Sequence, residues 1–191
     1  MTKSLVCNTS EPKFKHKTVY VFSNHNIIRH FSDIAKITHV NLFLEVNFEK
    51  EVLEGFAVLT IEKVDPNATE IILDVRELNI IQITDQSNGT KLDFVLHPSD
   101  YIGSQLQVNL PNSSERFVKV RIDYETTSKC TALQWLSPEQ TAGKTHPFVF
   151  SQCQANHCRS MMPCQDTSSV KMTYSAEVSK IFKKLFYQNS N

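Results

Sequence analysis

The chain has 191 residues with 20 basic and 20 acidic side chains, and 40% of its residues are hydrophobic. This length suits a single domain with a sizeable core, and the hydrophobic content excludes an intrinsically disordered chain. The formal net charge of +0 gives no general reason to expect nucleic acid binding, and no stretch approaches the roughly 20 apolar residues of a transmembrane segment.

The charges are distributed unevenly. Residues 1–36 carry six basic and two acidic side chains, and residues 179–191 carry three basic and none that are acidic, which leaves 11 basic and 18 acidic side chains in residues 37–178. We therefore expect an irregular basic arm at 1–36, a folded body at 37–178, and an unrelated short basic tail at 179–191.

The arm bears on the compartment of the protein. It lacks the apolar run of about 7–15 residues that a secretory signal requires, and a short strand at residues 18–22 is the one regular element that it suggests. The five cysteines are an odd number, which favours free thiols over disulfides. The sequence thus predicts a cytoplasmic protein.

Hydrophobic and polar residues alternate along the body from residue 38 onward, as in half-buried β-strands. The alternating runs cover residues 40–48, 57–61, 71–75, 78–83, 92–96, 106–110, 118–124 and 170–178. Turn residues separate them, no helical period interrupts them, and the run 78–83 changes phase by one residue, as a β-bulge would. The pattern predicts an all-β fold, an antiparallel curved double sheet or sandwich.

The tail at 179–191 has two interpretations. It could form a short amphipathic helix for a membrane surface or a partner, with lysines on one side and apolar residues on the other, or it could be a short tail without regular structure. The apolar residues are Ile181, Phe182, Leu185 and Phe186.

The segment 130–166 is broken by prolines and a glycine, and we expect a long surface excursion there rather than a pair of strands. Its Trp135 is expected to anchor the segment in the core. The spacing C-x3-H-C-x5-C from Cys153 to Cys164 fits structural zinc poorly, so free thiols are expected. Gln152 and Gln154 could bind a peptide backbone or N-terminus, or could bond to the backbone of their own loop.

This segment carries a family resemblance. The run ALQWLSPEQTAGKTHPFVFSQCQANHCRSMMPCQD and the following SVKMTYSAEV resemble the leukotriene A4 hydrolase and arginyl aminopeptidase branch of the zinc (gluzincin) aminopeptidases. LDVRELNI and RIDYETT fit the same domain more loosely. The resemblance covers roughly residues 38–178 and implies a saddle-like N-terminal β-domain, which in the family precedes a thermolysin-like catalytic domain and a helical domain.

The resemblance also implies roles for three residues. Gln154 would contact the N-terminal residue of a peptide substrate near its free amine, Gln152 would line the deeper pocket, and Ala155 would leave room for the first side chain. Asn156 replaces the usual apolar residue beside this loop, and Met161-Met162 replaces an aliphatic pair. The family's zinc ligands come from H-E-x-x-H and a later Glu, and this sequence contains no H-E-x-x-H.

Three hypotheses follow. The first is a truncated aminopeptidase that comprises only the substrate-facing β-domain, holds no catalytic residue and no cofactor, and is inactive without the missing catalytic domain. The second is a free-standing β-sandwich module that binds peptides or a full-length paralogue. The third is a fragment that is not stably folded by itself, in which Trp135 or the Met161-Met162 pair is exposed to water.

Overall fold

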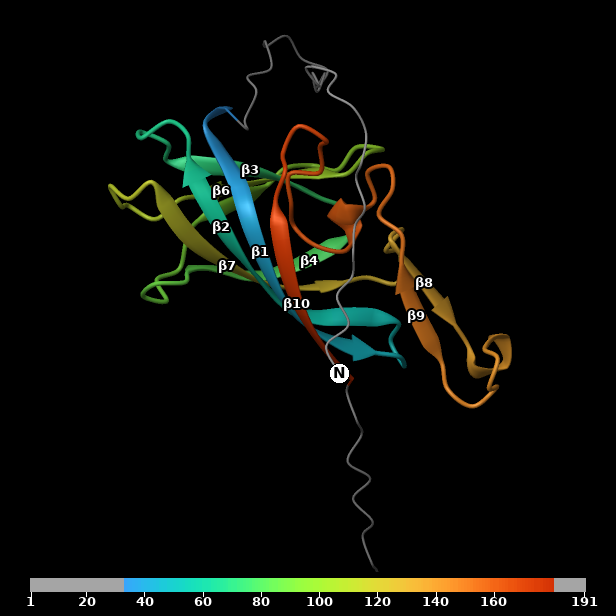
Figure 1. The fold of residues 1–191 in the computed structure, drawn as a ribbon. Coiled ribbons are helices and arrows are strands. Elements are labelled where there is room, and N and C mark those ends of the chain that lie inside the picture. The colour runs from blue at the N-terminus through green and yellow to red at the C-terminus, as the bar shows by residue number, and fades with distance from the viewer. Residues whose placement is uncertain (1–32, 181–191) are drawn as a thin grey trace, which may run out of the picture.

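The computed structural model of the chain describes residues 33–180, which form two β-sheets packed face to face and a separate hairpin (Figure 1). The five-stranded sheet has the order β10-β1-β2-β7-β4, and the three-stranded sheet has the order β3-β6-β5. The strands are β1 (Ala35–Asn47), β2 (Val52–Lys63), β3 (Glu70–Val75), β4 (Leu78–Asp85), β5 (Phe94–Leu96), β6 (Ser104–Asn109), β7 (Phe117–Thr126), β8 (Leu133–Leu136), β9 (Phe148–Ser151) and β10 (Thr173–Lys180).

The predicted strand at 18–22 and nearly all of the tail lie outside the described residues. Within residues 33–180, the only helical elements are 3-10 turns such as Pro138–Gln140 and Cys158–Ser160, and none of these elements is long and apolar enough to span a membrane. The prediction of an all-β sandwich is confirmed.

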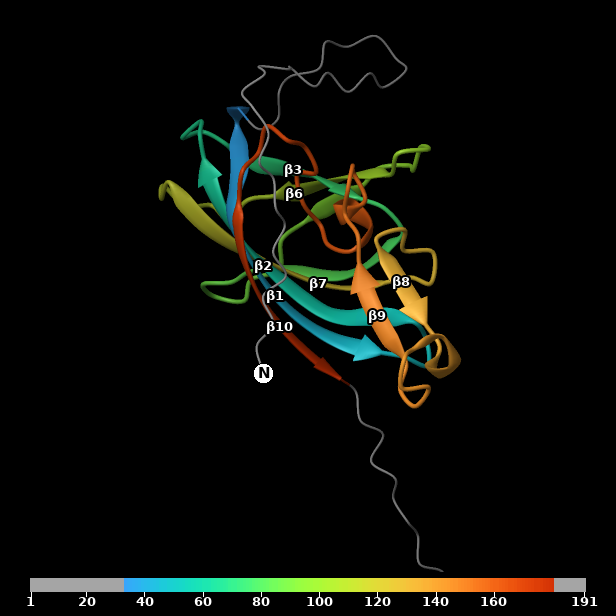
Figure 2. The ribbon, with the colours of Figure 1, turned by 45° about the vertical axis from the view of Figure 1, so that its right-hand side comes forward.

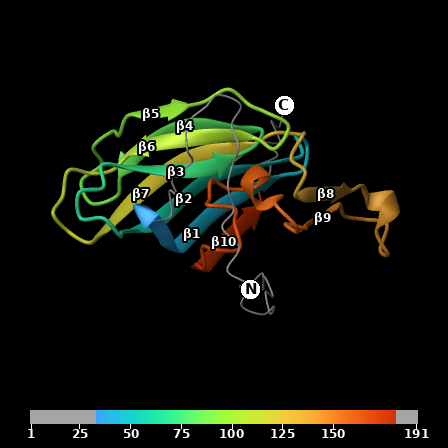
Figure 3. The same ribbon diagram turned by 90° about the horizontal axis from the view of Figure 1, so that it is seen from above.

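The core lies between the two sheets, as the view from above shows (Figure 3). Every second residue of each central strand points into it, which is the alternation seen in the sequence. From the five-stranded sheet come Leu42, Leu44, Ala57, Leu59, Ile61, Val118, Val120, Ile122 and Tyr124, and from the other sheet Ile71, Leu73, Val75, Leu106 and Val108. Burial of these side chains is the main favourable contribution to folding.

The predicted phase change in the fourth run is a β-bulge. The register of β4 against β7 shifts between Ile80 and Gln82. The extra residue, Ile81, is 63% exposed, so it lies outside the core although its type is apolar. The bulge lets Ile83 return to the buried face.

One strand pairing differs from the antiparallel expectation. β10 runs parallel to β1, with His39 opposite Thr173 and Val46 opposite Lys180. A parallel neighbour requires a long connection, and β10 reaches the sheet after the chain has passed through residues 152–172 without a further strand. The alternation in the sequence identifies a strand but not its direction.

The expectation of an excursion without strand pairing at 130–166 was wrong. β8 and β9 pair as an antiparallel hairpin, with Trp135 opposite Val149. This hairpin projects beside the sandwich (Figure 2). Trp135 is half-buried and meets the ring of Phe48 edge-on, at 5.5 Å between centroids. It therefore joins the hairpin to the turn between β1 and β2. Met161 and Met162 are buried, which contradicts the hypothesis that they are exposed.

Candidate functional site

The three residues that the resemblance assigns to substrate binding lie together on a loop directly after β9. Gln152, Gln154 and Ala155 are all exposed. The backbone N–H of Gln152 donates to the carbonyl of Ala132 at 2.8 Å, which continues the hairpin by one hydrogen bond. The peptide bond between Gln154 and Ala155 is cis. The start of the loop is thus held by the hairpin, and the residues at its tip are exposed to solvent.

The two glutamine side chains have different surroundings. Oε1 of Gln152 accepts a hydrogen bond from the backbone N–H of Gln154 at 3.2 Å, so this amide already binds its own loop. The side-chain amide of Gln154 has no hydrogen bond within residues 33–180. Its two N–H donors and its carbonyl oxygen remain open to a molecule outside the described residues.

Ser160 anchors the far side of the loop. Its hydroxyl accepts the N–H of Ala132 at 3.0 Å and donates to the carbonyl of His157 at 2.8 Å, and its carbonyl accepts the thiol of Cys130 at 2.9 Å. Nδ1 of His157 also lies 2.8 Å from the hydroxyl of Thr131. These bonds tie the loop to the chain just before β8.

A buried arginine ties the same loop to the three-stranded sheet. Arg159 is 2% exposed, and its guanidinium lies 3.3 Å from a carboxylate oxygen of Asp74 in β3 and 3.0 Å from one of Asp166. Burial raises the pKa of Asp74, and the charge of Arg159 acts in the opposite direction. The arginine must remain paired, because an unpaired buried charge is strongly destabilising.

Hydrophobic alternation does not predict this buried ion network. Asp74 stands between Leu73 and Val75 in a strand, where alternation predicts a solvent-facing residue. The available signal was an arginine placed among small, sulfur-containing and hydrophobic residues at 158–164.

The cysteines of the loop are free thiols, as expected. The neighbouring Cys158 side chain raises the pKa of the Cys153 thiol, and burial raises it further. A protonated thiol is a poor nucleophile and metal ligand. Within residues 33–180 no group of three or more His, Cys, Asp and Glu side chains could hold a metal ion, so these residues do not fit the zinc of the family.

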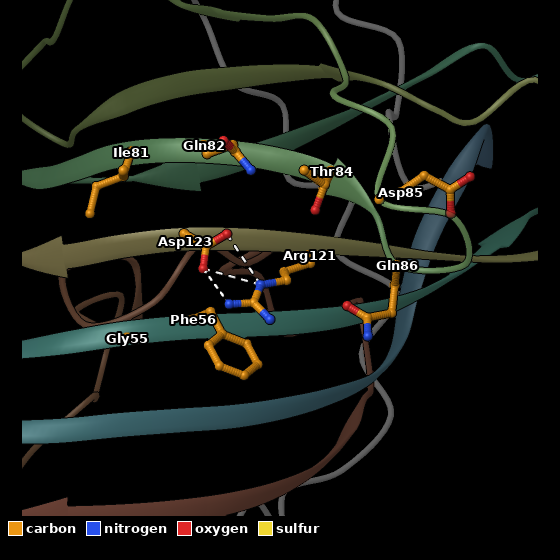
Figure 4. Close-up of a pocket in the computed structure, with 10 residues that line it drawn as sticks. Gly55, Phe56, Ile81, Gln82, Thr84, Asp85, Gln86, Arg121 and Asp123 are labelled. Atoms are coloured by element: carbon orange, nitrogen blue, oxygen red, sulfur yellow. Dashed lines mark hydrogen bonds and ion pairs between the residues drawn. The ribbon is translucent and has the colours of Figure 1, made fainter.

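A groove with a volume of about 720 Å³ lies away from this loop, on the side of the five-stranded sheet opposite the core (Figure 4). None of the three candidate residues lines it. The guanidinium of Arg121 lies 3.6 Å from the centre of the Phe56 ring and 2.6 Å from a carboxylate oxygen of Asp123. The arginine in this groove is therefore already paired with Asp123 and stacked on Phe56.

Comparison with protein families identifies the domain type. The model of the peptidase M1 N-terminal domain matches residues 36–190, a range that includes most of the segment predicted to be an unrelated tail. The leukotriene A-4 hydrolase of Xenopus laevis is 44% identical over 146 residues, which are 75% of this chain and 24% of that protein. Leucine aminopeptidase 2 of Yarrowia lipolytica is also 44% identical, over 75% of this chain and 22% of that protein. The chain spans about a quarter of the length of these relatives.

Solved structures agree with this assignment. Yeast LTA4 hydrolase in complex with bestatin superposes with a TM-score of 0.71 at 36% identity, over 79% of this chain and 24% of that one. An M1 zinc metallopeptidase from Deinococcus radiodurans has a TM-score of 0.56 at 18% identity, over 76% of this chain and 32% of that one, which shows a common fold. Because the family model matches well over half of its residues, this chain belongs to the peptidase M1 family through that family's N-terminal β-domain.

Proposed function

We propose that this chain is a substrate-facing wall of an aminopeptidase-type cleft and that its loop at 152–155 binds the N-terminal residue of a peptide. Gln154 contacts the residue that carries the free amine, Gln152 shapes the deeper part of the pocket, and Ala155 leaves space for the first side chain. The observation that carries the proposal is the exposed Gln154 amide, which has no partner within residues 33–180 and stands on a loop fixed by buried polar contacts.

The partner of this wall is a catalytic domain of the family's thermolysin-like type. Next to the loop, the rings of Phe148 and Phe150 on β9 are 54% and 44% exposed and lie 6.3 Å apart. Two large exposed aromatic side chains on a projecting hairpin favour contact with another protein surface. The four free cysteines of the described residues fit a reducing compartment, the cytoplasm.

The chain by itself is proposed to bind but not to hydrolyse peptides. Metal-assisted amide hydrolysis requires an activated water and a general base held at the metal. The sequence has no H-E-x-x-H, and the described residues offer no metal-binding group. Purified chain is expected to contain no stoichiometric zinc and to leave arginyl and alanyl chromogenic amides intact. Stoichiometric metal together with turnover would overturn this part of the proposal.

Peptide binding can be tested without catalysis. An arginyl tripeptide with a free amine should shift the backbone amide resonances of residues 152–155, and its N-acetylated form should not. Gln154→Ala should weaken binding about tenfold, which is the scale of a lost hydrogen bond to a charged group. Gln134→Ala, an exposed glutamine on β8, is the matched control and should change nothing. Equal binding of both peptides, or equal effects of both variants, would contradict the proposed role.

A further inference from the structure

The five-stranded sheet has one face that no other described element covers. The three-stranded sheet packs on the opposite face only, so the side chains that point away from the core meet no layer within residues 33–180 (Figure 3). We call this surface the outer face. The outer face does not include the loop at 152–155, because none of the loop's candidate residues belongs to the five strands.

Strand register places acidic side chains in two adjacent rows across the outer face. One row runs Glu177, Phe43, Phe56 and Asp123, and the next runs Ser179, Glu45, Glu54 and Glu125, from β10 through β1 and β2 to β7. Five carboxylates thus occupy eight neighbouring positions. Lys50 pairs with Glu54 and Arg121 pairs with Asp123, so these carboxylates outnumber their paired cations by three.

An aromatic pair lies in the middle of these carboxylates. The rings of Phe43 and Phe56 stack with their centroids 4.7 Å apart, and Phe43 is 37% exposed. The groove described above is lined by Phe56 on β2, Asp123 on β7 and Thr84 on β4, so it extends from the aromatic pair to the β4 edge of the sheet (Figure 4). A ligand for this face therefore needs positive charge to meet the carboxylates and apolar groups to cover the phenylalanines.

We infer that the outer face is the docking surface for the chain's own C-terminal segment, residues 181–191. That segment follows directly after β10, whose last residues lie at the acidic rows, since Ser179 is opposite Glu45 and Lys180 is opposite Val46. Residues 181–191 contain two lysines, no acidic residue, and the aromatic residues Phe182, Phe186 and Tyr187. Its charge and its apolar content both complement the outer face.

The segment is long enough to cross this face. Eleven extended residues reach about 36 Å, at roughly 3.3 Å each. Three strand spacings of about 4.8 Å separate β10 from β7, about 14 Å in total. Because the segment is covalently attached, even weak contacts act at a high effective concentration.

The inference can be tested by photocrosslinking the full chain with p-benzoylphenylalanine in place of Phe186. Mass spectrometry should place the crosslinks within one chain, on β1, β2 or β7 of the outer face. In about 1 M NaCl the yield should fall about threefold, because salt at that concentration shortens the screening length to about 3 Å. Lys183→Glu with Lys184→Glu should lower the yield to a similar extent.

A charge exchange separates docking from accidental contact. Adding Glu45→Lys and Glu177→Lys to the tail double variant should restore the yield, whereas Glu115→Lys, an exposed residue on the β6–β7 connection, should not. Thermal unfolding of each variant confirms that the sandwich is intact. Crosslinks between two chains would indicate a second copy as the occupant and would overturn the inference, as would crosslinks to other surfaces or a yield that does not depend on charge.

Discussion

The central sandwich and the segment at 130–166 are held together in different ways. In the sandwich, strands β2 and β7 contribute apolar side chains at every second position, and these pack against β3 and β6. The segment has short strands of four residues each and is fixed by hydrogen bonds and ion pairs around Ser160 and Arg159. Apolar periodicity therefore builds the scaffold, whereas buried polar contacts hold the exposed loop at 152–155 in place.

Loss of the buried ion network around Arg159 should destabilise the protein most. Arg159→Met removes the partner of Asp74 and Asp166 and leaves both carboxylates without their cation. The free energy of unfolding should fall by about 3–5 kcal/mol, as is typical when one partner of a buried ion pair is removed. Urea denaturation measures the loss.

Arg121→Met is the matched control, because its side chain is 35% exposed and its ion pair with Asp123 lies on the outer face. It should cost no more than about 1 kcal/mol. Equal losses in the two variants would show that the network of Arg159 contributes nothing particular to the loop.

Apolar packing also differs between the two regions. Leu59 is fully buried in β2, and Leu59→Ala should cost about 2–5 kcal/mol, since it leaves a cavity between the sheets. Trp135 is half-buried against Phe48, so Trp135→Ala should detach the hairpin locally and cost less in global unfolding. Hydrogen exchange should then increase at β8 and β9 but not at β2. Equal exchange throughout the chain would show that the hairpin unfolds together with the sandwich.

The difference between the regions also explains what could be predicted from the sequence. Alternation identified the sandwich strands and even the bulge at Ile81, because a one-sided buried strand imposes period two on its residues. It missed the hairpin, since LQWL and FVFS are four-residue strands that carry apolar residues on both faces. It also could not give the parallel direction of β10, which depends on the path of residues 152–172.

For the candidate site, the family resemblance predicts which residues take part but not the contacts that hold them. Gln152, Gln154 and Ala155 are predictable only from the family resemblance of the sequence around them, and they lie on one exposed loop. The contacts that fix this loop join residues far apart in the chain, as Arg159 and Asp74 do. Local sequence carries no signal for such pairs, so the support of the site became visible only in the fold.

A third, smaller effect is a pair of opposite pH dependences. Burial raises the pKa of Asp74 above its ordinary value of 3.8, so its contribution to stability is complete below that pH and is lost as the pH rises through the folded-state pKa. Hydrogen bonds from Lys36 and then Arg116 lower the pKa of Glu62 below 4.5, so its contribution is present above that pH and is lost on acidification.

Stability measured against pH between about 3 and 6 separates these two carboxylates. Asp74→Asn should remove a decline of stability with rising pH, and Glu62→Gln should remove a decline with falling pH. Slopes that change in the same direction in both variants would show that one of the two pKa shifts has the wrong sign.

The smallest effect is expected where the apolar scaffold contains a polar atom. Tyr124 is fully buried in β7, and within the described part of the chain its hydroxyl has no hydrogen-bond partner. A buried hydroxyl without a partner costs about 1–3 kcal/mol, so Tyr124→Phe should be neutral or should raise the free energy of unfolding by up to about 1 kcal/mol. Tyr101→Phe, at a position 87% exposed, is the control and should have no effect. A clear loss of stability in Tyr124→Phe would mean that the hydroxyl makes a hydrogen bond in solution. The contrast with Arg159 would then disappear, because both regions would depend on buried polar contacts.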